Sequence, residues 1–230
     1  MNNANDAKKS SPAPTVPQHR INIRTLTLIG LFTAISCVLG VWAIPIVPIS
    51  ITLGLFSIFL NAYILGWKKG TISILIYLLL GAMGLPVFSC FSGGLGIILG
   101  PGGGYIVSWI LVGLIVGFFS EKFPLNTSTH IALKFLGFLL GIAVCYLVGT
   151  IWFVQVAYDT PTVANYVSAL AVCVYPFIPL DIAKAVATLL MGPKIRKALL
   201  QTNLLEIYKF TVFLYIYNVN TYLLEAQQWN

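Results

Sequence analysis

Long runs of uncharged, apolar residues dominate this chain, and short clusters of Lys, Pro or Gly separate them. Such runs are typical of transmembrane helices rather than of one large soluble core. The composition agrees, because 58% of the 230 residues are hydrophobic and only 8% are charged, against about 25% charged residues in an ordinary soluble domain. So few charges could not cover the surface of a water-soluble globule. We therefore expect one polytopic domain whose solvent is the lipid bilayer.

Six largely uncharged stretches predict helices. They are residues 26–44, 52–66, 71–84, 105–119, 131–154 and a last segment that ends near Met191. At 1.5 Å per residue, the second and third stretches cover only about 21 to 23 Å, less than the roughly 30 Å hydrocarbon core. The predicted fold is an all-α integral membrane bundle of six transmembrane helices, with flanking Pro- and Gly-rich loops that can lie within the membrane.

The basic residues set the predicted orientation. They fall before the first stretch, between the second and third, around the connection from the fourth to the fifth, and after the sixth: Lys8, Lys9, Arg20, Arg24, Lys68, Lys69, Lys122, Lys134, Lys194, Arg196 and Lys197. The remaining connections contain no Lys or Arg. By the positive-inside rule, this alternation places both the N and the C terminus in the cytoplasm.

The two ends of the chain differ from the part between them. Residues 1–23 are polar and Pro-rich, which predicts a disordered cytoplasmic leader without a cleavable signal peptide. Residues 24–200 make up the predicted membrane domain. Residues 201–230 are apolar and aromatic but interrupted by charged and amide side chains. We expect a divergent tail there. An interfacial helix is favoured over an imperfect seventh span.

A long uncharged connection joins the third and fourth stretches, with the sequence GLPVFSCFSGGLGIILGPGGGYIVSW. Its Gly and Pro content is incompatible with a regular helix, and its Phe, Leu and Ile content is incompatible with free solvation. Such backbone is tolerated at membrane depth only where it is buried in protein or lines a cavity. We predict a re-entrant, lid-like loop over a site on the non-cytoplasmic side. Its Gly93 and Gly94 would allow the backbone to approach a ligand closely, with turn formation alone as the alternative.

Three segments of the chain resemble the BioY family. YLLLGAMGLPVFSCFSGGLGIILGPGGGYIVSW resembles the characteristic region of that family, and VYPFIPLDIAKAVATLL resembles its final-helix motif, in which Pro-Phe precedes Asp181 and Lys184. VPISITLGLFSIFLNAYILGWKKG resembles its second-helix region. The resemblance covers roughly residues 24–200. This chain departs from the family pattern near ISITLG, where a Gln is usual, and at Gly102 in GPGGG, where a Thr is usual.

The resemblance implies binding and uptake of biotin by the substrate-capture (S) component of an energy-coupling-factor (ECF) importer in a prokaryotic plasma membrane. The implied partners are a transmembrane coupling (T) subunit and two ABC-type ATPase subunits. Biotin is implied as the transported ligand, and no cofactor is expected. The sequence agrees with an energy supply from partner subunits, since it has no Walker motif and no chain of intramembrane carboxylates. Scattered cysteines predict no metal site, and scattered basic residues predict no nucleic-acid binding.

Asp181 is the only acidic residue within an apolar stretch, and Lys184 follows it on the same helical face. A charge at membrane depth costs about 2.5 to 3.5 kcal/mol on insertion scales, so such residues are candidates for a functional site. With biotin as ligand, Asp181 would accept hydrogen bonds from the ureido N–H groups, and Lys184 would pair with Asp181 or contact a ligand oxygen. The alternative is an ordinary first-turn Asp after Pro179, favoured by the helix dipole.

Aromatic walls would be needed for the apolar ring and chain of biotin. The candidates are Tyr77 in the third stretch and Phe88, Phe91 and Tyr105 in or beside the loop. For each of them, packing of the loop without ligand contact is an equal alternative.

Gly30 and Ala34 form a small-xxx-small pattern near the cytoplasmic end of the first stretch. This spacing lets two helices approach closely, and packing inside the same protein explains most cases. The family resemblance implies that an Ala-x-x-x-Ala pair on this helix docks on the coupling subunit. Here Gly30 replaces the first Ala.

Three other functions stay open from the sequence. The chain could be an S component for another small vitamin, and a purified chain that binds riboflavin or thiamine would show this. It could be an integral-membrane enzyme with Asp181 as a base, although it lacks a paired nucleophile and a metal-ligand cluster. A structural membrane scaffold would bind no small ligand.

Overall fold

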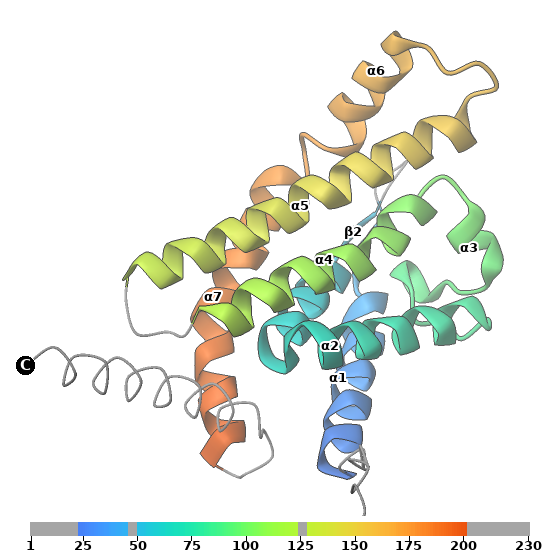
Figure 1. Ribbon diagram of the computed structural model, residues 1–230. Helices are drawn as coiled ribbons and strands as arrows, with labels where there is room; N and C mark the ends of the chain where they lie inside the picture. Colours follow the sequence, from blue (N-terminus) through green and yellow to red (C-terminus); the bar gives the residue numbers. More distant parts are fainter. Residues whose placement is uncertain (1–22, 46–49, 124–127, 202–230) are drawn as a thin grey trace, which may run out of the picture.

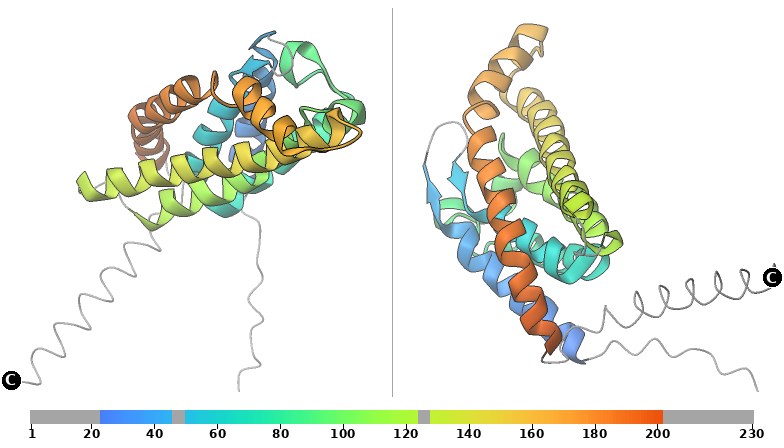
Figure 2. Two further views of the ribbon diagram at one scale, coloured as in Figure 1. Left: turned by 90° about the horizontal axis from the view of Figure 1, so that it is seen from above. Right: turned by 90° about the vertical axis from the view of Figure 1, so that its left-hand side faces the viewer.

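The computed structural model describes residues 23–45, 50–123 and 128–201, and this part of the chain is mostly helical (Figures 1 and 2). The longer helices are α1 (Ile23–Val41), α2 (Gly54–Ala82), α4 (Gly103–Lys122), α5 (Ser128–Ala157), α6 (Val163–Cys173) and α7 (Ile178–Gln201). Between α2 and α4 lie the 3₁₀ helix η1 (Ser89–Phe91) and the short helix α3 (Leu95–Leu99). The predicted leader, residues 1–23, and tail, residues 201–230, fall almost entirely outside the described residues.

Among the described residues, four helices are long and apolar enough to cross a membrane: α1, α2, α4 and residues His130–Ala157 of α5. Together, α6 and α7 make a fifth candidate, bent by 52° at the break between them. Large apolar side chains such as Leu31, Leu79, Leu147 and Leu190 are at least half exposed on these helices. Outer surfaces of this kind fit a lipid solvent, so the chain is a multi-pass membrane protein.

The helix α2 consists of two arms that fold back on each other at Gly66. Gly66 has a φ of 81°, a conformation that only glycine adopts readily. Asn61 Nδ2 donates a hydrogen bond to Ser73 Oγ at 2.8 Å, although 12 residues of straight helix would separate these positions by about 18 Å. The arms, 54–65 and 67–82, match the second and third predicted stretches.

Three predicted boundaries are wrong in detail. The turn inside α2 is at Gly66, and Lys68 lies within the second helical arm. The first helix ends at Val41 rather than Ile44, because Pro45 disfavours helical geometry in the residue before it. Residues 43–44 instead form β1 (Ala43–Ile44), which pairs antiparallel with β2 (Ile51–Thr52). The last helix continues to Gln201 across Pro193, which removes one backbone hydrogen bond without ending it.

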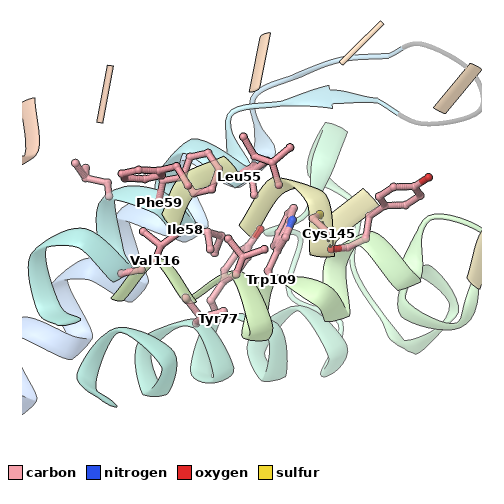
Figure 3. Close-up of a cluster of buried hydrophobic side chains, with 14 of the residues drawn as sticks. Leu55, Ile58, Phe59, Tyr77, Trp109, Val116 and Cys145 are labelled. Atoms are coloured by element: carbon pink, nitrogen blue, oxygen red, sulfur yellow. Dashed lines mark hydrogen bonds between the residues drawn. The ribbon is translucent and has the colours of Figure 1, made fainter. Parts of the chain in front are cut away.

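The core lies where α2, α4 and α5 pack together (Figure 3). The Tyr77 ring stacks on Trp109 with centroids 6.1 Å apart and meets the edge of Phe88 at 5.7 Å. From α5, Phe138 packs edge-on against Phe59 at 5.0 Å. The contact between Tyr77 and Phe88 holds the loop between α2 and α4 against the bundle.

Buried polar groups tie the helices together at the Gly66 end. The Ser120 hydroxyl on α4 donates to the Tyr63 carbonyl of α2 at 2.6 Å. From α7, Arg196 Nη1 donates to the Ser120 carbonyl at 3.3 Å. From α5, Lys134 Nζ lies 3.4 Å from the Tyr63 hydroxyl and 4.7 Å from its ring centroid. The Glu121 carboxylate accepts a hydrogen bond from the Trp67 backbone, at the first residue of the second arm. We call Tyr63, Ser120, Lys134 and Arg196 the Gly66 cluster.

Candidate ligand-binding site

The loop between α2 and α4 packs onto both helices. The Gly94 N–H donates to the Gly81 carbonyl at 2.7 Å, and the Tyr77 hydroxyl donates to the Val87 carbonyl at 3.1 Å. The Phe88 ring is buried against Gly81, where a Cβ would overlap it. The Phe88 ring therefore occupies the space that a side chain at position 81 would need. The loop covers the ends of α2 and α4.

A pocket of ≈ 260 Å³ lies between this loop, β2 and the start of α4. It is lined by Ser50, Thr52, Phe88, Ser89, Gly96, Ile97, Gly100, Pro101, Gly102, Tyr105, Ile106 and Trp109. We call it the loop pocket. From the far side, Trp152 Nε1 of α5 donates to the Gly100 carbonyl at 3.0 Å. The loop pocket thus has aromatic walls. Contacts with α2, α4 and α5 hold it in shape.

Two of the predicted aromatic residues, Phe88 and Tyr105, line the loop pocket. Tyr77 is fully buried behind its wall, against Trp109. Phe91 is 72% exposed and has a φ of 58°, so it lies on the outside of the loop. Of the predicted glycines, Gly93 packs against the Leu85 carbonyl and Gly94 has a φ of 99°. Those two glycines shape the loop, and neither is part of the lining.

Asp181 lies in the first turn of α7 and is only 4% exposed. Lys184 Nζ contacts Asp181 Oδ1 at 2.8 Å, which confirms the predicted pairing of these two side chains. The other oxygen, Oδ2, accepts a hydrogen bond from the Tyr146 hydroxyl of α5 at 2.7 Å. A carboxylate has about four acceptor positions, so this arrangement leaves room for a donor on each oxygen.

A second hollow, of ≈ 340 Å³, lies between α5 and α6. It is lined by Ala143, Tyr146, Leu147, Thr150, Ile151 and Leu170. We call it the α5–α6 groove. Its two hydroxyl residues each reach a predicted ligand residue, since Tyr146 bonds Asp181 and Thr150 lies 3.1 Å from the Tyr105 hydroxyl.

The predicted ligand residues therefore form two groups that α5 connects. Phe88 and Tyr105 belong to the loop pocket, whereas Asp181 and Lys184 lie on α7 outside its lining. Tyr146 and Thr150, one helical turn apart on α5, contact one group each. Neither was predicted, because a Tyr and a Thr in an apolar stretch are ordinary membrane-helix residues. Only the packing of α5 against α4 and α7 reveals them.

The arrangement offers groups that can recognise a ligand. It combines an ionised pair, several hydroxyls and aromatic walls. Within the described residues, no group of three or more His, Cys, Asp or Glu side chains could hold a metal ion. Such a site suits a small, partly apolar ligand that carries N–H donors.

Gly30 and Ala34 lie apart from this site, on the exposed face of α1. A Cβ added at Gly30 would meet nothing within 4 Å. Large exposed side chains, including Leu26, Leu31 and Val38, flank the pair. This strip of α1 has a small-residue notch and no covering element among the described residues.

Comparisons with known proteins agree with this reading of the sequence. The BioY family model matches residues 10–201. The chain is 37% identical over 176 residues to the biotin transporter BioY of Thermotoga maritima, a match that covers 76% of this chain and 97% of the relative. It is 34% identical over 179 residues to the biotin transporter BioY of Lactococcus lactis, with 76% and 92% covered.

A solved structure matches as well. The crystal structure of the S-component for biotin from an ECF-type ABC transporter superposes with a TM-score of 0.64 at 32% identity. The match covers 76% of this chain and 92% of that one. With family model, relatives and solved structure in agreement, the chain belongs to the BioY family.

Proposed function

We propose that this chain binds biotin and is the substrate-capture component of an ECF-type importer in the plasma membrane of a prokaryote. The observation that carries the proposal is the buried Asp181, whose two oxygens accept one contact each, from Lys184 and Tyr146, of the about four that a carboxylate can accept. The names of the matched relatives and of the matched structure supply the ligand, biotin.

In this proposal the ligand contacts both groups of residues. Asp181 accepts a hydrogen bond from a ureido N–H, and Lys184 balances its charge or contacts a ligand oxygen. Phe88 and Tyr105 form walls for the apolar ring and chain. Tyr77, Gly93 and Gly94 keep the loop in place around the ligand. Phe91 is not among the proposed contacts, because its side chain is 72% exposed and does not line the loop pocket.

The proposed topology has six spans: α1, the two arms of α2, α4, α5 and the bent pair α6 and α7. Both termini lie in the cytoplasm, and the loop pocket faces the other side. A transmembrane coupling subunit and two ABC-type ATPases supply the energy. The coupling subunit docks on α1, where Gly30 and Ala34 let a partner helix approach closely.

The test is isothermal titration of biotin into the detergent-purified chain. We expect one-to-one binding, weakened about 100-fold or more in Asp181→Ala and in Lys184→Ala, because each change leaves a buried charge without its partner. Asp159→Ala is the matched control, since it removes an exposed carboxylate in the connection between α5 and α6. Binding of riboflavin or thiamine without binding of biotin would overturn the ligand assignment.

A further inference from the structure

Tyr146 occupies a position that the family motifs did not single out. Its hydroxyl is on α5, 35 positions before Asp181 in the sequence, and donates to Oδ2 at 2.7 Å. Its ring also lines the α5–α6 groove. Tyr146 thus separates this groove from the Asp181 carboxylate.

The two donors fix the carboxylate in complementary ways. Lys184 comes from the same helix as Asp181 and holds Oδ1 at 2.8 Å. Tyr146 comes from a different helix and holds Oδ2. A contact within one helix still allows the Asp181 side chain to turn about its own bonds, whereas a second contact from α5 removes that freedom. The acceptor positions that remain on both oxygens therefore have defined directions.

Preorganised acceptors bind a ligand N–H better than mobile ones, because no rotamer freedom is lost on binding. A hydrogen bond between a neutral hydroxyl and a carboxylate is among the stronger ones in proteins. It holds the carboxylate without adding charge to the site.

We propose that Tyr146 is a positioning residue for ligand recognition: it orients the Asp181 carboxylate toward the ligand N–H group. The inference rests on the proposed function, in which Asp181 is the acceptor for biotin. It assigns to α5 a specific part in recognition, that of fixing the directions in which α7 accepts hydrogen bonds.

Tyr146→Phe tests the proposal, because it removes the hydroxyl and keeps the ring in the α5–α6 groove. We expect the affinity for biotin to fall about tenfold, the scale of one hydrogen bond to a charged group. The guanidinium analogue of biotin, in its protonated form, should lose less than threefold. The Coulombic attraction between its charge and the carboxylate does not depend on the orientation of the carboxylate, so this attraction remains in Tyr146→Phe. Equal losses for both ligands would mean a general disturbance of the fold and would overturn the proposal.

A second measurement uses the Asp181→Asn background. There Tyr146→Phe should weaken biotin binding by less than a further twofold, and a full additional tenfold loss contradicts the inference. Tyr166→Phe is the matched control, because its hydroxyl contacts exposed Gln155 at 3.4 Å. If the unaltered chain binds no biotin, the proposed function fails. If it binds biotin and Tyr146→Phe binds equally well, only the role of Tyr146 fails.

Discussion

Two regions of this bundle bury charged side chains, and they satisfy those charges differently. At the start of α7, Asp181 and Lys184 pair with each other at 2.8 Å. In the Gly66 cluster, the cations of Lys134 and Arg196 contact hydroxyl, carbonyl and aromatic groups. In the proposed function the Asp181 carboxylate accepts a further hydrogen bond from the ligand, whereas Arg196 Nη1 donates to the Ser120 carbonyl and hydroxyl of α4. The proposal thus gives the first region a part in recognition and the second a part in holding helices together.

The comparison shows that burial of a charge does not by itself mark a binding site. Lys134 is 2% exposed and Asp181 is 4% exposed, so depth does not separate them. The difference lies in the kind of contact, which is an ion pair with a second donor at Asp181 and hydrogen bonds to hydroxyl and carbonyl groups at Lys134 and Arg196. The following predictions test whether the two regions have the separate roles that this difference implies.

The largest effect on stability is expected at the turn of α2. Gly66→Ala would force a side chain into a positive φ and place its Cβ on the Glu121 carboxylate. We expect the free energy of unfolding to fall by about 3 to 4 kcal/mol, from strain and overpacking together. Thermal unfolding in detergent measures this change. Biotin affinity of the molecules that remain folded should be unchanged.

Gly84→Ala is the matched control for that change. Gly84 has a φ of +100°, and a Cβ there would meet nothing within 4 Å. Only the backbone strain applies, so we expect a loss of about 1 to 2 kcal/mol. Equal losses for the two variants would show that the contact with Glu121 does not contribute.

Much of the fold follows from the apolar pattern of the sequence. Each predicted stretch coincides with a helix or with one arm of α2, because runs this apolar need intrachain hydrogen bonds in lipid. The errors lie at the ends. The pattern placed the turn of α2 at Lys68 and Lys69, because charges mark connections. In the structure a single glycine at position 66 makes the turn, and the helix resumes at once.

The site was predictable only where its residues are close in sequence. Asp181 and Lys184 lie three positions apart, so helical periodicity alone predicts their contact. Tyr146 reaches Asp181 from another helix, and no spacing rule connects α5 with α7. Phe91 shows the opposite case, because its aromatic character suggested a wall while its backbone conformation directs it outward.

The next prediction exchanges a lysine for methionine in each region. Lys184→Met leaves the Asp181 carboxylate without its cation, and we expect a loss of about 3 kcal/mol in stability and, as for Lys184→Ala, about 100-fold or more in biotin affinity. Lys134→Met replaces the buried cation with an unbranched apolar side chain that is one atom shorter, and it should change stability by less than about 1.5 kcal/mol, with biotin affinity unaltered. Thermal unfolding and titration measure both. A large loss of biotin affinity in Lys134→Met would show that both regions contribute to binding and would contradict their separate roles.

The smallest effect on the isolated chain is expected on α1. Ala34→Leu fills the notch beside Gly30 on a surface that no described residue covers, so stability should change by less than about 0.5 kcal/mol. Biotin affinity should stay the same, because neither region with buried charges is touched.

If this strip contacts the coupling subunit, copurification of that subunit and biotin uptake should both fall at least tenfold. Ala132→Leu makes the same exchange at an exposed position of α5 and should leave both unchanged. Unchanged uptake by Ala34→Leu would remove this part of α1 as the docking surface. The separate roles of the Asp181 region and the Gly66 cluster would still stand, since both are measured without a partner.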